Sequence, residues 1–441
     1  MTLNLSIEWI TILMFGSMLL IMLMGLPVAF SCGTVGVIFT ALLQGPAAVN
    51  IVPTRIFGLM TNYLLAAIPL FILMACIAER GGLIRDIYEA VYQWSGTLRG
   101  GVAHASIIAC SLMAAMVGVI GASEVTMGLI ALPEMLKRRY DKWMAIGSIL
   151  AGGTLGILIP PSAMLIVYGM VDNSSIGQLY AGAFLPGFLL AGLFLAYVAI
   201  RCALNPTMGP PIPKEERLPL GQRARKLLPL IPMSVLIFLV LGTIVVGIAA
   251  PTEAAGVGAA GAFVMMALQK KLTWKGIVQA CENTLKSSAM VLWTMFGANV
   301  FVALYVMVGG GTFVTQLIMA AGQKYVILYI MMFILIFLGA FIDWVGIIML
   351  TVPLFGPIIR KLGFDPIWFG VLFAVNMQLS FLTPPFGYAL FYLKGVAPPE
   401  ITTKDIWGGA AVFLLLQFIG LNLLILFPDI ILVLPRLFFR G

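Results

Sequence analysis

The chain has 441 residues, of which 61% are hydrophobic and 10% charged, and its formal net charge is +8. Soluble domains carry about 25% charged residues, so this composition excludes an ordinary soluble protein. A crossing takes about 20 residues, which allows roughly ten to fourteen membrane segments and no large soluble domain. Basic residues cluster between apolar runs, which is typical of positive-inside topology rather than of nucleic-acid binding. The composition predicts an all-α, multi-pass membrane protein.

Cysteine and histidine content argues against metal or catalytic chemistry. The five cysteines lie singly, without paired spacing. The lone histidine, His104, cannot by itself complete a zinc site or a catalytic triad. We therefore expect no enzyme activity and no cofactor.

Residues 1–203 form the first half of the predicted organisation. Four apolar runs in this half predict membrane helices, at residues 9–24, 26–44, 63–78 and 178–200. A short loop through Pro53 and Arg55 precedes the third run. Residues 83–98 have apolar side chains at helical spacing, with Ile87 and Val91 among them, which predicts an amphipathic helix along the membrane interface.

Two further segments of this half are unusual. Residues 100–136 are mostly apolar but have basic residues at both ends, which predicts a re-entrant hairpin with its tip near 118–126. Residues 143–170 are apolar enough to cross a bilayer, yet Pro160-Pro161 removes two amide donors from the middle. Backbone left unpaired at membrane depth is tolerated only where it lines a site, so we predict a broken helix there.

Residues 204–227, rich in proline and basic residues, predict a cytoplasmic linker, and 228–441 repeats the plan of the first half. Its apolar runs include 228–249, 253–268 and 287–308. A second hairpin is expected at about 326–358, and a second broken helix at 366–393 contains Pro384-Pro385.

One offset relates the two halves. Pro27 and Pro251, Asp141 and Asp365, and Pro160 and Pro384 each differ by 224 positions. Five crossings and one hairpin per half predict inverted repeats, with both termini periplasmic. This topology places Arg360-Lys361 outside, against the positive-inside trend. At the hairpins, Ser123 precedes Pro133 by ten residues and Asp343 precedes Pro353 by ten, which suggests equivalent tips.

Hairpin tips and helix breaks supply the candidate site. Hard oxygen ligands of low total charge beside a helix interruption suit Na⁺ better than Ca²⁺ or a transition metal. The candidate Na⁺-binding residues are Gly121, Ser123, Thr126, Gly153, Ile159, Pro160, Gly339, Asp343, Phe381, Thr383 and Pro384. Helices that restart after each break could instead meet an anionic substrate. The candidate substrate-binding residues are Glu124, Pro161, Ser162, Pro385 and Gly387. The intramembrane carboxylates Glu124 and Asp343 could also relay protons or hydrogen-bond the amides of their own hairpins.

Several motifs resemble one transporter family. They include GASEVTMGLIALPEML in the first half and FIDWVGIIMLTVPLFGPI and LSFLTPPFGYALFYLKGVAPPEI in the second. Together they resemble the large membrane subunit of a tripartite ATP-independent periplasmic (TRAP) transporter, of the ion transporter superfamily. The resemblance implies an elevator mechanism in the bacterial inner membrane, with a small four-helix membrane subunit and a periplasmic substrate-binding protein as partners. It also implies Na⁺-driven carboxylate uptake, with Na⁺ near Ser123 and Pro160-Pro161, and near Asp343 and Thr383-Pro384-Pro385.

Departures from that family and rival functions keep alternatives open. Many relatives have a serine where this chain has Glu124, and a proline soon after the aspartate where it has Trp344 to Gly346. This pattern is closer to a branch associated with mannitol or chloroaromatic compounds, some of whose binding proteins take 2-oxo or 2-hydroxy monocarboxylates. A single-component Na⁺/anion symporter is one alternative, and an intramembrane acyl- or glycosyltransferase is another.

Overall fold

Helices form every regular element in residues 5–117, 120–384 and 387–439, the ranges that the computed structural model describes. In the first half they are α1 Ile7–Leu23, α2 Val28–Gln44, α3 Ile51–Met60, α4 Ala67–Arg80, α5 Leu83–Ser95, α6 Gly101–Val117, α7 Ile120–Lys137, α8 Lys142–Thr154, α9 Ala163–Asp172 and α10 Ile176–Leu204. They continue as α11 Leu220–Leu227, α12 Ile231–Val245, α13 Pro251–Leu268, α14 Trp274–Met307, α15 Gly310–Met319, α16 Lys324–Gly339, α17 Trp344–Lys361, α18 Pro366–Leu382, α19 Tyr388–Val396, α20 Thr403–Leu426 and α21 Asp429–Phe438. The prediction of an all-α protein is confirmed.

Several of these helices are long and apolar enough to cross a bilayer. Within the described ranges, six helical segments of at least 18 residues qualify by length and composition, and others of 10 to 17 residues are nearly as apolar. The hairpin helices α6 and α7, with 17 and 18 residues, span roughly 25 to 27 Å at 1.5 Å per residue. That length is slightly less than the roughly 30 Å hydrocarbon core of a bilayer.

The predicted loop through Pro53 and Arg55 is wrong, because both residues lie in α3. Pro53 occupies the first turn of that helix, where the missing amide would have no helical acceptor, so the helix tolerates it. The linker is likewise only partly irregular, since α11 forms its last eight residues.

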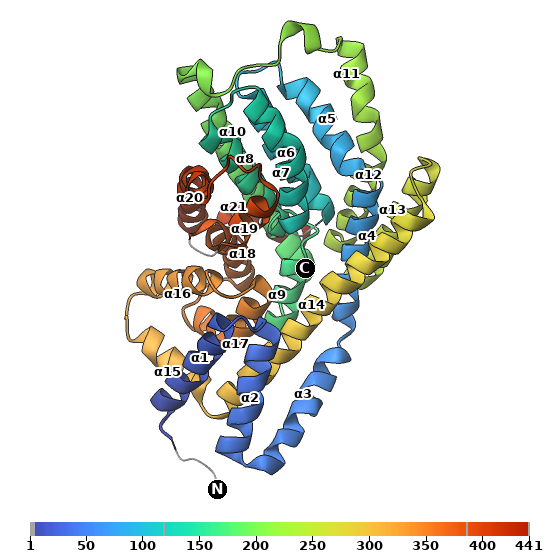
Figure 1. The fold of residues 1–441 in the computed structure, drawn as a ribbon. Helices are drawn as coiled ribbons and strands as arrows, with labels where there is room; N and C mark the ends of the chain where they lie inside the picture. The colour runs from blue at the N-terminus through green and yellow to red at the C-terminus, as the bar shows by residue number, and fades with distance from the viewer. Residues whose placement is uncertain (1–4, 118–119, 385–386, 440–441) are drawn as a thin grey trace.

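The two hairpins occupy different ends of the molecule. The N-terminus lies at the lower end of Figure 1 and α11 at the upper end. Helices α6 and α7 descend side by side from the upper end toward the middle, whereas α16 and α17 lie in the lower half. The long helix α14 crosses obliquely between the ends and packs against α2 and α4.

Helix bounds in the two halves follow one offset. Adding 224 to both ends of α7, Ile120–Lys137, gives both ends of α17, Trp344–Lys361. The first residue of α8, Lys142, likewise corresponds to the first residue of α18, Pro366 (366 − 142 = 224). By this offset Pro133 is equivalent to Pro357 rather than to Pro353. The ten-residue match that related Ser123 to Asp343 therefore joins positions that are not equivalent.

The helices that lead into the two breaks are buried over almost their whole length. Every residue of α18 from Ile367 to Leu382 is buried, as is every residue of α8 from Met144 to Thr154. A helix that is apolar on all sides is stable only where protein surrounds it or where it faces lipid. Most large exposed apolar side chains lie on other helices, such as Trp274 of α14 and Phe333 of α16.

Both break-leading helices begin at an aspartate that caps them. The Asp141 side chain accepts a hydrogen bond from the Met144 amide at 2.9 Å, and Asp365 accepts from the Ile367 amide at 2.8 Å. An acidic N-cap satisfies an amide that the helix itself leaves unpaired.

We expect Asp141→Ala or Asp365→Ala to lower the free energy of unfolding by about 1 kcal/mol, because each change leaves helix amides without an acceptor. Thermal unfolding of the purified protein in detergent would measure the loss. Lys142→Ala, which changes the adjacent exposed residue, is the control. An equal loss in that control would show that the caps have no special role.

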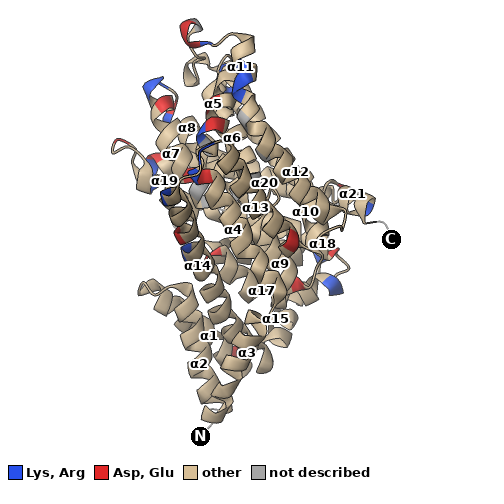
Figure 2. Ribbon diagram, turned by 90° about the vertical axis from the view of Figure 1, so that its right-hand side faces the viewer, with Lys and Arg blue, Asp and Glu red and all other residues tan. Residues whose placement is uncertain are grey.

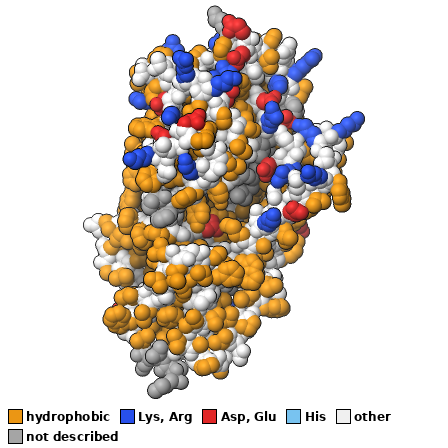
Figure 3. Space-filling view, viewed as in Figure 1, with side chains coloured by type: hydrophobic (Ala, Val, Ile, Leu, Met, Phe, Trp, Pro, Cys, Tyr) orange, Lys and Arg blue, Asp and Glu red, His pale blue; other side chains and the backbone are white. Residues whose placement is uncertain are grey.

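Charged side chains gather at the upper end of the molecule, around α5, α7 and α11 (Figure 2). The lower part of the face shown in Figure 3 is mostly hydrophobic.

Helix α11 packs on α5, where Trp94 Nε1 donates to the Arg223 carbonyl at 3.2 Å and Lys226 Nζ donates to Glu89 Oε2 at 2.9 Å. The bond from Lys226 holds the pKa of the Glu89 carboxyl below its ordinary value. Arg138 at the end of α7 pairs with Glu216 of the linker.

The other hairpin has its own charge pair. Arg360 in the last turn of α17 lies 2.9 Å from Asp172 Oδ1 at the end of α9, and it also donates to the Asp172 carbonyl at 3.0 Å. Asp172 is buried, so the arginine neutralises a carboxylate that lacks water. This pairing gives Arg360 a structural role independent of the positive-inside trend.

Candidate functional site

The first break separates α8 from α9. A short 3₁₀ turn, Leu155–Ile157, follows α8, and the chain leaves the helical path before α9 begins at Ala163. Because Pro160 and Pro161 have no amide hydrogen, the carbonyls four residues earlier receive no helical bond. The Ser162 hydroxyl donates to one of them, Ile157, at 2.5 Å and accepts from the Leu165 amide at 3.4 Å. Ser162, a predicted substrate ligand, thus bridges the break and caps α9.

The second break separates α18 from α19. Thr383 ends α18, and its hydroxyl donates to the Leu379 carbonyl at 2.7 Å. The Gly387 amide donates back to the Thr383 carbonyl at 3.1 Å. A Cβ atom on Gly387 would lie 2.3 Å from the Phe381 carbonyl oxygen, so this close approach of Gly387 to the end of α18 requires glycine. Pro385 lies outside the described residues.

A cavity of about 140 Å³, called here the central cavity, lies where the tips of both hairpins approach the second break. Gly121 comes from the first hairpin, Asp343 and Trp344 from the second, and Phe381 from the end of α18. The remaining lining residues are Ile72 of α4, Ala163 of α9, Ser287, Met290 and Val291 of α14, and Tyr388 and Tyr392 of α19. Three of the predicted site residues, Gly121, Asp343 and Phe381, therefore meet at one cavity.

The electrostatics of the central cavity are negative. Among its described lining residues, Asp343 is the one charged side chain, and none is a lysine, arginine or histidine. Asp343 is the N-cap residue of α17, is buried, and has an Oδ2 atom without a hydrogen-bond partner. The neutral polar side chains among the described lining residues are Ser287, Tyr388 and Tyr392, which carry hydroxyls, and Trp344, which carries an indole N–H.

Glu124 is completely buried but does not line the central cavity. Its side chain packs against α8, since a Cβ atom on Gly153 would lie 2.3 Å from Glu124 Cγ and 2.9 Å from Oε1. Neither carboxylate oxygen has a hydrogen-bond partner. The structure thus brings Glu124 together with Gly153, a predicted Na⁺ residue, at the last turn before the first break.

The other predicted residues lie around these two positions. Ser123 is buried and Thr126 half-buried in α7. Gly339 touches Ser380 of α18, because a Cβ atom there would lie 2.3 Å from Ser380 Cβ. Pro161 is buried in the first break, and Pro384 is exposed at the second.

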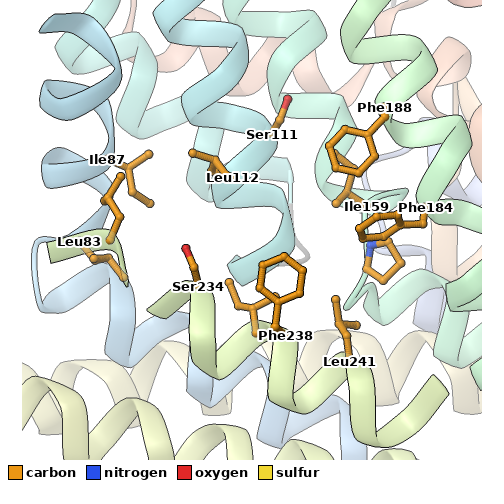
Figure 4. Close-up of a pocket in the computed structure, with 13 residues that line it drawn as sticks. Leu83, Ile87, Ser111, Leu112, Ile159, Phe184, Phe188, Ser234, Phe238 and Leu241 are labelled. Carbon is orange, nitrogen blue, oxygen red and sulfur yellow. The ribbon is translucent and has the colours of Figure 1, made fainter. Parts of the chain in front are cut away.

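Ile159 and Pro160 line a different cavity, of about 130 Å³, called here the outer cavity. Its walls come from α5, α6, α10 and α12, with Phe184, Phe188 and Phe238 among the labelled side chains of Figure 4. Among its described lining residues, Ser111 and Ser234 are the ones with a polar side chain. Because an organic anion needs more polar or charged partners, this cavity does not suit one.

A buried polar cluster joins the two halves next to the first break. Gln417 Nε2 of α20 donates to Thr154 Oγ1 at 2.9 Å and to Gln378 Oε1 at 3.4 Å. Thr154 and Gln378 differ by 224 positions and approach within 3.5 Å of one another. Two residues at the common offset of 224 therefore meet in this cluster.

Sequence reasoning missed several residues that line the central cavity. Tyr388 and Tyr392 are four residues apart in α19 and so share one helix face, a spacing that could have signalled a lining role. Ser287 and Met290 of α14 carried no such signal, because their helix is far from both breaks in sequence.

Comparison with known proteins identifies relatives over nearly the whole chain. Residues 15–430 match the family model described as the DctM component of the tripartite ATP-independent periplasmic transporter. The chain is 30% identical to the C4-dicarboxylate TRAP transporter large permease protein of Rhodobacter capsulatus, over 97% of this chain and 99% of the relative. It is 28% identical to the sialic acid TRAP transporter large permease protein of Vibrio cholerae, over 94% and 96%. It is also 29% identical to the isethionate TRAP transporter permease protein DctMQ of Oleidesulfovibrio alaskensis, over 88% of this chain but 61% of that longer protein.

Two solved transporter structures share the fold. The YdaH transporter of Alcanivorax borkumensis superposes with a TM-score of 0.60 at 17% identity, over 88% of this chain and 90% of that one. MtrF of Neisseria gonorrhoeae superposes with a TM-score of 0.62 at 13% identity, over 87% and 84%.

Proposed function

Because the chain belongs to the DctM family, the large membrane permease components of TRAP transporters, we propose that it carries a small organic anion inward together with Na⁺. The family consists of transporter permeases, so the chain is not an intramembrane transferase. The observation that carries the proposal is the central cavity, where the tips of both hairpins and the second break converge on a buried aspartate.

Charge balance at the central cavity supports cation coupling. An anionic substrate beside Asp343 would place two negative charges in a poorly hydrated space without a basic side chain on its described walls. Removing such charges from water without compensation is strongly unfavourable. Cations that bind with the substrate would supply the missing positive charge. Na⁺ fits oxygen ligands of this kind, and no group of three or more metal-binding side chains exists among the described residues to favour a transition metal.

The relatives bear on the substrate class. Those compared above are named for C4-dicarboxylates, sialic acid and isethionate, which are all organic anions. For this chain we propose a small carboxylate, and within that class a 2-oxo or 2-hydroxy monocarboxylate, since a second carboxylate on the substrate would add another negative charge beside Asp343.

Two protein partners complete the proposed transporter. The fused isethionate relative is longer than this chain and bears the combined name DctMQ, which supports a separate small membrane subunit as a partner here. The composition left no room for a large soluble domain. A periplasmic substrate-binding protein would therefore deliver the solute to this chain in the bacterial inner membrane.

The architecture supports an elevator mechanism built on inverted repeats. The common offset of 224 in helix bounds favours two structural repeats, 1–203 and 228–441, joined by the linker 204–227. The central cavity is lined by α4 and α14 as well as by the two hairpin tips, and this arrangement favours movement of the hairpins against these two helices. The hairpins are proposed to enter the membrane from opposite faces, with both termini periplasmic.

Uptake by proteoliposomes tests the proposal. We expect accumulation of a 2-oxo or 2-hydroxy monocarboxylate only with an inward Na⁺ gradient, the small subunit and the binding protein all present. An equal K⁺ gradient is the control. Equal uptake at low micromolar substrate without the binding protein would favour the single-component symporter instead. Uptake that is the same with and without the Na⁺ gradient would refute coupling to Na⁺.

A further inference from the structure

We propose that Glu124 is a direct ligand of a coupling cation at the first hairpin, and that its carboxylate makes this site charged. The inference rests on the proposed Na⁺ coupling and assigns Glu124 a role different from substrate contact. Three observations carry it: the burial of the side chain, its lack of any partner, and its position against the last turn before the first break.

Burial makes an uncompensated charge at Glu124 unfavourable. The residue is 0% exposed, and both of its oxygens lack a hydrogen-bond partner. Asp172, another buried carboxylate, has Arg360 beside it at 2.9 Å. No salt bridge of the described residues reaches Glu124, so a ligand must supply the positive charge whenever the carboxylate is ionised.

Position identifies a small cation as that ligand. Glu124 does not line the central cavity, so a substrate held there would not reach it. It packs instead on Gly153, and the absence of a side chain there leaves Glu124 Cγ next to the α8 backbone. The first break begins directly after that turn, where Pro160 removes a helical donor from the Gly156 carbonyl. The two carboxylate oxygens of this buried side chain have no hydrogen-bond partner and are hard ligands, which suit Na⁺.

The consequence is a requirement for loading. With the cation bound, the first hairpin carries no net charge at its tip, whereas without it a bare carboxylate would have to move through an apolar environment. The empty site therefore disfavours movement of the hairpin, which limits transport of substrate without its cation.

Na⁺-dependent thermal stabilisation of the purified chain tests the inference separately from transport. We expect Glu124→Gln to raise the Na⁺ concentration for half-maximal stabilisation about tenfold above that of the wild type, because a charged ligand is lost. Titration with K⁺ in place of Na⁺ is the salt control. Glu124→Asp, which keeps the charge but shortens the side chain, should give a smaller increase. The matched control is Glu134→Gln, the same change ten residues further along α7. Glu134 forms an ion pair with Arg138, so this variant should leave the Na⁺ concentration for half-maximal stabilisation unchanged.

The outcomes separate this inference from the proposed function. If the wild-type chain shows neither stabilisation nor uptake that depends on Na⁺, the proposed Na⁺ coupling fails. If the wild type responds to Na⁺ and both Glu124 variants respond at the same concentrations, Glu124 is not a ligand and the inference fails. A Glu124→Gln protein that keeps its Na⁺ response but loses a dependence of uptake on a proton gradient would also overturn it, because the carboxylate would then carry protons.

Discussion

Asp343→Asn is expected to raise the Na⁺ concentration for half-maximal uptake about a hundredfold, which corresponds to roughly 3 kcal/mol of lost cation stabilisation. Asp343 is the one charged residue on the described walls of the central cavity, and its Oδ2 atom has no protein partner. Asparagine keeps the size of the side chain but removes the charge that would hold a cation beside an anionic substrate.

The same substitution should hardly change which solute is carried, because the binding protein is proposed to choose it. Ser123→Ala should weaken Na⁺ dependence in the same direction but less, since only a neutral hydroxyl is lost. Na⁺ titrations of uptake in proteoliposomes measure both effects. Asp429→Asn, an exposed residue paired with Arg436, is the control. Unchanged titrations in both variants would remove the basis for placing a cation at the hairpin tips.

Gly339→Ala is expected to abolish most transport and to destabilise the protein by about 1 to 3 kcal/mol, the usual cost of overpacking a core. A Cβ atom at this position would lie 2.3 Å from Ser380 Cβ and 2.5 Å from Ser380 Oγ. The clash would push α16 away from α18 next to the hairpin tip, and so would displace Asp343 relative to the second break.

A compensating change at Ser380 tests whether this contact causes the damage. Ser380→Gly removes both clashing atoms, so the double variant Gly339→Ala/Ser380→Gly should recover folding and uptake relative to Gly339→Ala alone. Thermal unfolding and Na⁺-driven uptake measure the recovery. Gly192→Ala in α10 is the control, because a Cβ atom there meets nothing within 4 Å. If Ser380→Gly gave no recovery, the contact between these residues would not be the cause of the damage.

Local chemistry explains why so many helix boundaries were predictable. Asp141 and Asp365 accept bonds from helix amides in the turn that follows them, and this capping depends on a few adjacent residues. Proline pairs remove amide donors wherever the chain carries them, so both breaks could be located without a structure. Long apolar runs fixed the membrane class for the same reason, because burial in lipid depends on composition and length.

Side-chain direction was beyond such reasoning. The sequence assigned Glu124 and Ser162 to the substrate, and this assignment stays a prediction. The tertiary structure was needed to show that Glu124 faces Gly153 and that Ser162 bonds across its own break. Ile159 and Pro160 face the outer cavity. Each orientation depends on which neighbouring helix lies beside the residue, and sequence spacing does not contain that information.

The sequence by itself determined that this is an all-α membrane protein with two broken helices and a 224-residue internal offset, because hydropathy, capping and proline chemistry act over short distances. The tertiary structure decided which residues share the central cavity. Tyr388 of α19, Asp343 of the second hairpin and Ser287 of α14 come from three separate segments. They meet only because packing of the buried helices brings those segments to one point, and such packing depends on the shapes of side chains far apart in the chain.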